Sequence, residues 1–215
     1  MSSLARTALS VSVATSLYGI SFGALAVAAG LSVVQTQLLS LLMFTGGSQF
    51  AFVAAISGGG GGWAAVSAAS LMGLRNAVYG AQMNAELRPK GFRRLLAAHV
   101  TIDESVAVAM AQPAGQERAK GFAMTGWGVF IGWNVMTLAG SLLTSRVDPS
   151  VWGLDGAAVA AFVGLLWPRL KNREAWSIAA VAALAAVVTT PVAPLGTPIL
   201  VAALVAGLLG WRWAR

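Results

Sequence analysis

Long apolar stretches with very few charges dominate this chain of 215 residues. Hydrophobic residues make up 57% of the sequence, charged residues make up 10%, and the mean hydropathy is +0.75. Because a helix needs about 20 apolar residues to cross a bilayer, these stretches predict an all-α integral membrane protein. We expect one polytopic domain, residues 1–215, with about seven hydrophobic segments. The segments are Thr7 to Ala29, Leu38 to Ser57, Trp63 to Ala85, Gly121 to Thr144, Gly156 to Leu170, Trp176 to Val192 and Leu195 to Leu209.

Two of these segments are candidates to enter the membrane without spanning it. The segment from Gly156 to Leu170 is short, and the segment from Leu38 to Ser57 is interrupted by four small or polar residues. Irregular backbone at membrane depth must be covered by protein or line a water-filled cavity. We therefore predict that one or two segments are re-entrant or broken. The interrupting residues are Gly46, Gly47, Ser48 and Gln49.

The net charge of +7 is concentrated in the connections between segments. Cations cluster at residues 88–120, 169–173 and 212–215, whereas Arg146 lies alone in another connection. Since cytoplasmic loops carry an excess of Lys and Arg, we expect the three clusters and the C-terminus on the cytoplasmic side. This distribution indicates a lipid bilayer and no nucleic-acid partner. Seven full crossings place Arg6 outside, whereas a re-entrant second segment places it inside.

Several kinds of site are excluded by residues that the sequence lacks. There is no cysteine, so disulfides, thiolate chemistry and cysteine metal sites are ruled out. The glycine tract Gly58 to Gly62 is predicted to be a flexible connection, because no lysine follows it as in a phosphate-binding loop. We expect no cofactor, no metal site and no enzymatic activity. Energy for any transport must then come from an ion gradient, a partner or the substrate gradient.

Arg75 and Asn76 lie in the middle of the third segment, which holds no other charged residue. A cation at membrane depth costs at least about 2.5 kcal/mol, so it usually faces a polar cavity, a partner or a substrate. Both residues are therefore candidate substrate-binding residues. The structural alternative is that Arg75 bonds to a helix C-terminus or to a buried acid.

His99, Asp103 and Glu104 cluster within an otherwise apolar stretch from Leu95 to Met110. On a continuous helix, His99 and Asp103 are four residues apart and share one face. Acidic and histidine side chains beside membrane cavities are the usual proton carriers. We therefore predict that the three residues couple transport to protons. The alternative is an amphipathic surface helix with a solvated acidic pair.

Five short strings, in register over about residues 16–166, resemble the AzlC family, the large subunits of bacterial branched-chain amino acid exporters. The resemblance implies a secondary exporter of valine, leucine and isoleucine, with methionine as a further substrate, in the bacterial inner membrane. It also implies a small AzlD-type membrane subunit as partner. The strings are Ile20-Ser21-Phe22-Gly23 through Gly30-Leu31-Ser32, Phe44-Thr45-Gly46-Gly47-Ser48-Gln49-Phe50, Leu74-Arg75-Asn76 with Tyr79-Gly80, Asp103-Glu104-Ser105, and Trp152-Gly153-Leu154-Asp155.

A zwitterionic amino acid needs a cation or a helix N-terminus for its carboxylate, an acceptor for its ammonium and an apolar pocket. Discontinuous helices supply the first two, because their unpaired N–H groups face the cavity. We predict that Gly46 to Gln49 form such a junction and bind substrate together with Arg75 and Asn76. The alternative for these small residues is a helix-packing surface.

Two other functions were weighed against the exporter. A passive channel or membrane scaffold without coupled transport is the main alternative, although one chain displays no ring of filter groups. A rhomboid-like intramembrane protease would use a serine and a histidine, here Ser48 and His99. Gln49 follows Ser48 where that family has glycine, which argues against the protease.

Overall fold

The computed structural model describes residues 2–146, 163, 167, 170–193 and 197–213. Within these residues the chain is all-helical and has no strand, so the predicted all-α class is confirmed. Most of the expected segment from Gly156 to Leu170 lies outside the described residues. The helices are α1 (Ser3–Ala28), α2 (Val33–Leu42), α3 (Gly46–Ser57), α4 (Gly62–Leu87), α5 (Phe92–His99), α6 (Asp103–Met110), α7 (Gln116–Thr144), α9 (Arg173–Thr189) and α10 (Thr197–Trp213).

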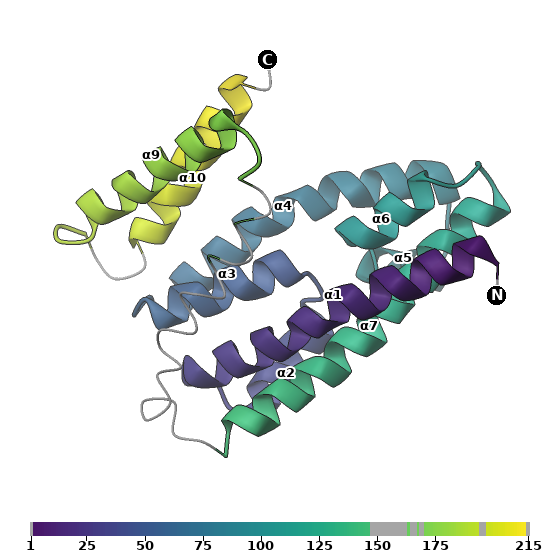
Figure 1. Ribbon diagram of the computed structural model, residues 1–215, viewed down its shortest axis with the longest axis horizontal. Coiled ribbons are helices and arrows are strands. Elements are labelled where there is room, and N and C mark those ends of the chain that lie inside the picture. The colour runs from purple at the N-terminus through teal and green to yellow at the C-terminus, as the bar shows by residue number, and fades with distance from the viewer. Residues whose placement is uncertain (1, 147–162, 164–166, 168–169, 194–196, 214–215) are drawn as a thin grey trace.

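Helices α1 and α7 pack side by side and run in the same direction (Figure 1). Leu4 near the start of α1 lies beside Gly121 near the start of α7, and Ile20 lies beside Gly140. A Cβ on Gly140 would lie only 2.1 Å from the carbonyl oxygen of Ile20, so only glycine permits this backbone approach. Among the described helices, these two are both long and apolar enough to cross a bilayer.

Helices α2 and α3 form a hairpin that enters the bundle and turns back at residues 43–45. The first turn of α3 lies beside the middle of α4, where Gly47 contacts Arg75, and its last turn packs near the start of α4, where Ala55 meets Ala65. The two helices have 10 and 12 residues, about 15 and 18 Å at 1.5 Å per residue, and neither spans about 30 Å. The predicted interruption is present, but it precedes the glycines, because α3 begins at Gly46.

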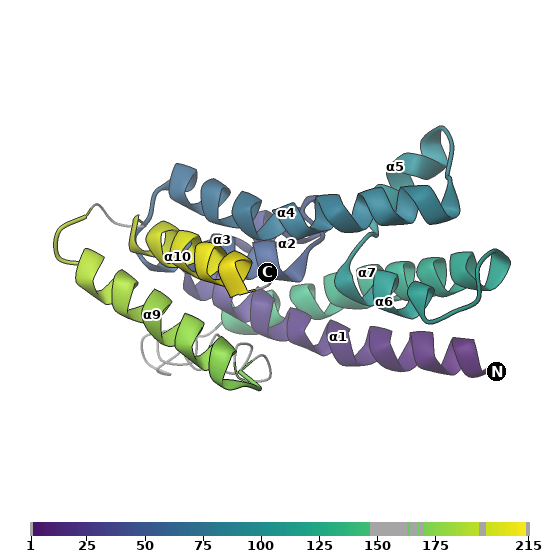
Figure 2. The same ribbon diagram turned by 90° about the horizontal axis from the view of Figure 1, so that it is seen from above.

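A second hairpin, α5 and α6, enters from the opposite end of the bundle (Figure 2). Its α6 arm runs back beside α7, because Gly126 packs against Val100 and Gly121 packs against Val108. The expectation that His99 and Asp103 share one helix face is wrong, since α5 ends at His99 and α6 begins at Asp103.

A buried hydroxyl holds the break between α5 and α6. Ser105 is fully buried, and its Oγ accepts from the Ile102 N–H at 3.0 Å and donates to the Val100 carbonyl at 2.9 Å. These bonds satisfy backbone groups that a continuous helix would pair along its own axis. No glycine or proline marks the break in the sequence from Val100 to Asp103.

The start of α1, the end of α4 and the start of α7 lie at one end of the bundle (Figure 1). That end carries Arg6, Arg88 and Arg118, and Arg118 forms a salt bridge across to Glu86 on α4. Arg146 follows the opposite end of α7. The second expected segment turns back at residues 43–45, and Arg6 lies at the end of the bundle that carries Arg88 and Arg118.

Helices α9 and α10 pack against each other, in the upper left of Figure 1. Ile199 and Leu200 in the first turns of α10 pack against a cluster formed by the end of α3 and the start of α4. The expected segments from Trp176 to Val192 and from Leu195 to Leu209 correspond to these two helices. Helix α10 therefore contacts the bundle at the end opposite to Arg6, where α3 ends and α4 begins.

Candidate functional site

A cavity of about 570 Å³ lies where the breaks of the two hairpins meet. Helices α1, α3, α4, α6 and α7 contribute to its wall, together with the connection before α3. Both hairpin breaks reach it, and the Phe44 ring lies 6.2 Å from the His99 ring, measured between centroids. The lining residues are Thr15, Tyr18, Phe44, Thr45, Gly46, Gly47, Phe50, Ala51, Ala54, Met72, Arg75, Ile102, Asp103, Glu104, Val129 and Trp133.

A salt bridge joins two of the predicted site residues across this cavity. Arg75 Nη1 lies 2.6 Å from Asp103 Oδ2, which connects the middle of α4 to the start of α6. The two side chains are 32% and 27% exposed, so the pair is accessible from the cavity. Arg75 is therefore paired with an acid, which was one of the two partners in its structural alternative. This acid, Asp103, is also one of the residues predicted to couple transport to protons.

The other edge of the Arg75 guanidinium lies against the first turn of α3. A Cβ on Gly47 would stand 2.7 Å from Arg75 Nη2, so the absence of a side chain at Gly47 makes room for the cation. Arg75 Nε has no hydrogen-bond partner among the described residues. Arg75 is thus positioned between a helix N-terminus and a carboxylate.

The first turn of α3 forms part of the cavity wall. Gly46 and Gly47 line the cavity, and the preceding Thr45 makes no side-chain cap. No acidic residue lies in this turn, so the positive end of the helix dipole has no counter-charge on its own helix. Ser48 is 1% exposed and its Oγ lacks a described partner. This turn has the geometry and polarity of an anion site.

Gln49 is occupied in structural hydrogen bonds. Its side chain is fully buried, its Nε2 donates to the Met43 carbonyl at 2.8 Å, and its Oε1 accepts from Trp133 Nε1 at 2.8 Å. These bonds tie the break between α2 and α3 to α7. Gln49 does not line the cavity. Its role in substrate binding stays a prediction, and such a role would act through the break that its side chain holds.

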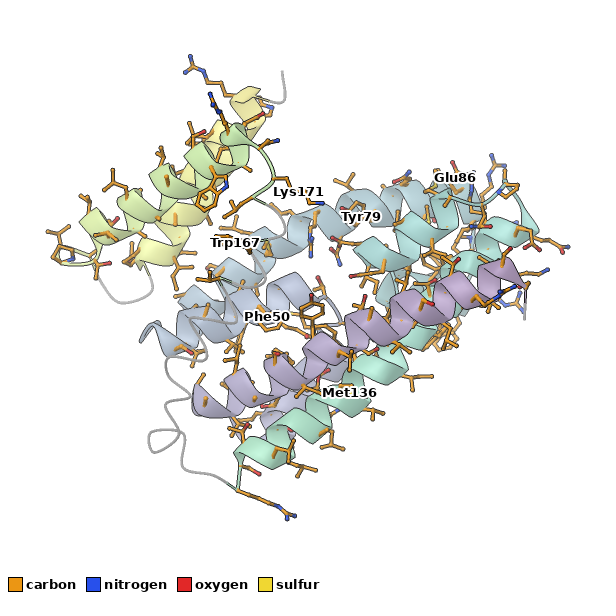
Figure 3. All side chains as sticks on the ribbon, in the orientation of Figure 1. Phe50, Tyr79, Glu86, Met136, Trp167 and Lys171 are labelled. Atoms are coloured by element: carbon orange, nitrogen blue, oxygen red, sulfur yellow. The ribbon has the colours of Figure 1, made fainter. Side chains whose placement is uncertain are left out.

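Aromatic rings form the apolar wall beside the charged groups. The Trp133 ring stacks on Phe22 at 6.3 Å between centroids and meets Phe50 edge-on at 6.3 Å. Figure 3 shows Phe50 on α3, next to α1. Because its one polar atom bonds to Gln49, Trp133 presents only apolar surface to the cavity.

Asn76 lies one residue beyond Arg75 and contacts the second break. Its Nδ2 donates to the Thr101 carbonyl at 3.3 Å, and its Oδ1 is buried without a described partner. Asn76 does not line the cavity. It therefore anchors α4 to the break from which Asp103 emerges.

The three residues predicted to couple protons fall into two environments. Asp103 and Glu104 form the first turn of α6 and line the cavity. The His99 ring instead packs against Phe44 and Phe130, 6.2 and 5.2 Å from their ring centroids, and these two phenylalanine rings also contact each other at 5.0 Å. The described structure thus brings the acids to the cavity and places the histidine in an aromatic cluster.

Several lining residues could not be recognised from the sequence. Thr15, Tyr18 and Met72 lie within apolar helices, and no local pattern separates them from residues that face the exterior. Only the folding of α1 and α4 around the hairpins selects them. Within the described residues there is no group of three or more His, Asp or Glu side chains that could hold a metal ion.

Comparison with known proteins gives one match. A family model described as AzlC protein matches residues 10–147. The match includes both hairpins, Arg75 and the acids at the start of α6. It ends before the string Trp152 to Asp155, which also lies outside the described residues. No curated protein and no solved structure matches the chain significantly.

Proposed function

The chain belongs to the AzlC family, and we propose that it is the large subunit of a two-component exporter of branched-chain amino acids. Family membership supports a membrane protein concerned with amino-acid transport in general. The finer proposal is secondary export of valine, leucine and isoleucine, with methionine as a further substrate, without enzymatic activity or a cofactor. The cavity between the two broken hairpins is the observation that carries it.

The chemistry of this cavity suits a small aliphatic amino acid. Its volume of about 570 Å³ falls in the usual range of small-molecule sites, about 300 to 1,000 Å³. Phe50, Met72 and Trp133 supply an apolar wall for the substrate side chain. Arg75 and Asp103 supply opposite charges beside it, which matches the two charged ends of an amino acid. Broken helices at membrane depth are the usual frame for such sites in transporters.

We further propose that an ion gradient, most simply the proton gradient, drives export. Asp103 and Glu104 line the cavity, and acidic side chains beside membrane cavities are the usual proton carriers. His99, the third residue predicted to take part in coupling, packs against Phe44 and Phe130.

In the proposed orientation the end with Arg6, Arg88 and Arg118 faces the cytoplasm of a bacterial inner membrane, in agreement with the positive-inside rule. The C-terminus, with Arg212 and Arg215, is proposed to be cytoplasmic as well. Lipid covers the apolar outer faces of the bundle. Such a face on α1 includes Leu9, Val13 and Leu17, each at least 52% exposed.

We propose an AzlD-type small membrane subunit as the partner, following the family. The outer apolar face of α7 gives it a surface that lipid otherwise covers. Ile131 is 61% exposed and Val135 is 56% exposed, at the spacing of one helix face. Copurification of the two subunits from membranes tests this part of the proposal directly.

Export is tested in cells fed a leucine-containing dipeptide. A strain lacking the chain should accumulate free leucine, and restoring the chain should lower the internal pool. The variant Arg75→Gln should fail to restore export, whereas Glu86→Gln should restore it, because Glu86 lies at the far end of α4 (Figure 3). Equal leucine pools with and without the chain would remove the exporter proposal and favour a scaffold.

Energy coupling is tested in liposomes that contain the chain and its partner. An imposed pH gradient should accelerate leucine movement, and Asp103→Asn should remove this acceleration while counterflow exchange continues. Glu104→Gln should have the same effect more weakly. If the wild-type protein moves leucine at equal rates with and without the gradient, protons do not drive it, and passive flow becomes the better description.

A further inference from the structure

The first six helices form two units with the same order of elements. Each unit has a long helix, a short connection, a short helix, a three-residue break and a second short helix. In the first unit these are α1, α2 and α3, and in the second they are α4, α5 and α6. Both long helices have 26 residues.

The two units are also in register along the sequence. Ser3 and Gly62, which begin the long helices, are 59 residues apart, and so are Val33 and Phe92, which begin the next helices. The first residues after the breaks, Gly46 and Asp103, are 57 residues apart. Such a nearly constant spacing across three elements is the mark of an internal repeat.

Backbone conformation supports the same correspondence. Each long helix is followed within two residues by a left-handed residue, Gly30 with φ of 94° and Arg88 with φ of 46°. Arg88 is the one non-glycine residue with positive φ among those described. A non-glycine residue in this conformation is uncommon and indicates that the position in the fold requires it.

The units run in opposite directions. Helix α4 is antiparallel to α1 (Figure 2), and the two hairpins enter the bundle from opposite ends and meet at the cavity. Repeats related in this inverted way commonly hold the substrate of a secondary transporter at their interface.

Equivalent first turns of α3 and α6 have opposite electrostatic character. The first turn of α3 is Gly46-Gly47-Ser48, and the first turn of α6 is Asp103-Glu104-Ser105. The two serines correspond and are both buried, at 1% and 0% exposure. The glycines leave the N–H groups of α3 without acidic compensation and admit the guanidinium of Arg75, whereas the acids place two carboxylates at the start of α6.

We propose that residues 3–57 and 62–110 are an inverted repeat whose two breaks hold opposite ends of a zwitterionic substrate. The substrate carboxylate binds the first turn of α3 and Arg75, and the substrate ammonium binds Asp103 and Glu104. This inference rests on the proposed function and adds to it the orientation of the substrate and the requirement for both of its charged ends.

The salt bridge between Arg75 and Asp103 shows that each of these side chains pairs with an opposite charge at the cavity. A zwitterion entering between them gives each side chain a new partner of the correct sign, so no charge is left unpaired. A ligand with only one charged end satisfies one side chain and leaves the other without a partner. Because an unpaired charge in a partly buried site is costly, one-ended ligands must bind more weakly.

Three ligands that share the leucine side chain test this requirement on the purified complex of the full-length chain with its small subunit. They are L-leucine, 4-methyl-2-oxopentanoate, which lacks the ammonium, and 3-methylbutylamine, which lacks the carboxylate. The readout is the rise in melting temperature with ligand concentration. We expect the half-saturating concentration of each one-ended ligand to exceed that of leucine at least tenfold.

Variants assign each end of the ligand to a side of the cavity. Asp103→Asn should abolish the preference for leucine over the oxo acid, and Arg75→Gln should abolish its preference over the amine. Glu86→Gln, which removes the carboxylate of the salt bridge with Arg118 far from the cavity, should leave the ranking of the three ligands unchanged.

The double variant Arg75→Asp with Asp103→Arg keeps a salt bridge but exchanges the charges, and it should lose leucine binding. Parental affinity in this variant, or equal affinity of the parent for all three ligands, overturns the two-ended site while leaving amino-acid export possible. Absence of leucine binding to the parent overturns both proposals. Because the comparison of three ligands uses the parent, it decides the question even if a variant does not fold.

Discussion

Replacing Gly47 with alanine adds one methyl group at the point where α3 faces the Arg75 guanidinium. The new Cβ would stand 2.7 Å from Arg75 Nη2 and 3.3 Å from Met72 Cγ. Ordinary van der Waals contact begins at about 3.4 Å, so the guanidinium must retreat by about 0.7 Å. Both crowded atoms belong to flexible side chains, and alanine is a better helix former than glycine. We therefore expect the variant to fold.

The functional consequence follows from the contact that Arg75 is proposed to make with the substrate carboxylate beside the first turn of α3. A retreat of about 0.7 Å moves the guanidinium away from that turn and so away from the carboxylate. A hydrogen bond to a charged group contributes about 1.5 to 3 kcal/mol, and we expect loss at the lower end because the Arg75 side chain is 32% exposed. About 1.4 kcal/mol corresponds to tenfold, so substrate affinity should fall roughly tenfold.

Export of leucine from cells and the melting temperature of the purified protein together check this reasoning. Gly47→Ala should keep the parental melting temperature within a few degrees and should show the affinity loss. Gly80→Ala serves as the matched control. Gly80 lies on the same helix as Arg75, and a Cβ at this position would have no neighbouring atom within 4 Å. Parental affinity in Gly47→Ala, with Arg75→Gln inactive, would refute the claim that the position of the guanidinium matters.

Three further outcomes are expected. Gly140→Ala should lower the melting temperature by the equivalent of about 1 to 3 kcal/mol or more, because its Cβ would stand 2.1 Å from a backbone oxygen of α1 that cannot move aside. Trp133→Phe should weaken the α2 to α3 break by leaving buried Gln49 Oε1 without its donor, at about 1 to 3 kcal/mol, measured by melting. Because the chain has no cysteine, the single variants Gly61→Cys and Ala114→Cys can report which side of the membrane each position faces. An impermeant maleimide should label Gly61→Cys in intact cells and should label Ala114→Cys only after permeabilisation. The opposite labelling pattern would reverse the proposed orientation.

Much of the helical organisation could be predicted because it depends on local properties. The apolar length around Arg75 predicts a long helix, and α4 spans Gly62–Leu87. Small and polar residues after Thr45 predict an interrupted helix, and the chain breaks just before them, at residues 43–45. Helix length and polarity are properties of consecutive residues, so the sequence contains them directly.

The break between His99 and Asp103 could not be predicted in the same way. Val100, Thr101 and Ile102 contain no glycine or proline to mark it, and the hydrogen bonds of Ser105 hold it. That serine lies at 0% exposure only in the folded chain. The expectation that His99 and Asp103 share one helix face assumed a continuous helix. It is wrong because the break between them depends on tertiary contacts that the local sequence does not show.

The sequence by itself determined that Arg75 needs a polar partner, because a lone cation in an apolar helix is too costly to leave unsatisfied. It could not determine which partner. Asp103 lies 28 residues away and reaches Arg75 only because α5 and α6 turn back into the bundle. Likewise, Gln49 faces Trp133, 84 residues away, only in the folded chain. Helices and the charges at their ends depend on residues that are neighbours in the sequence. The cavity depends on contacts between two hairpins that enter from opposite ends of the bundle, and these contacts form only in the tertiary structure.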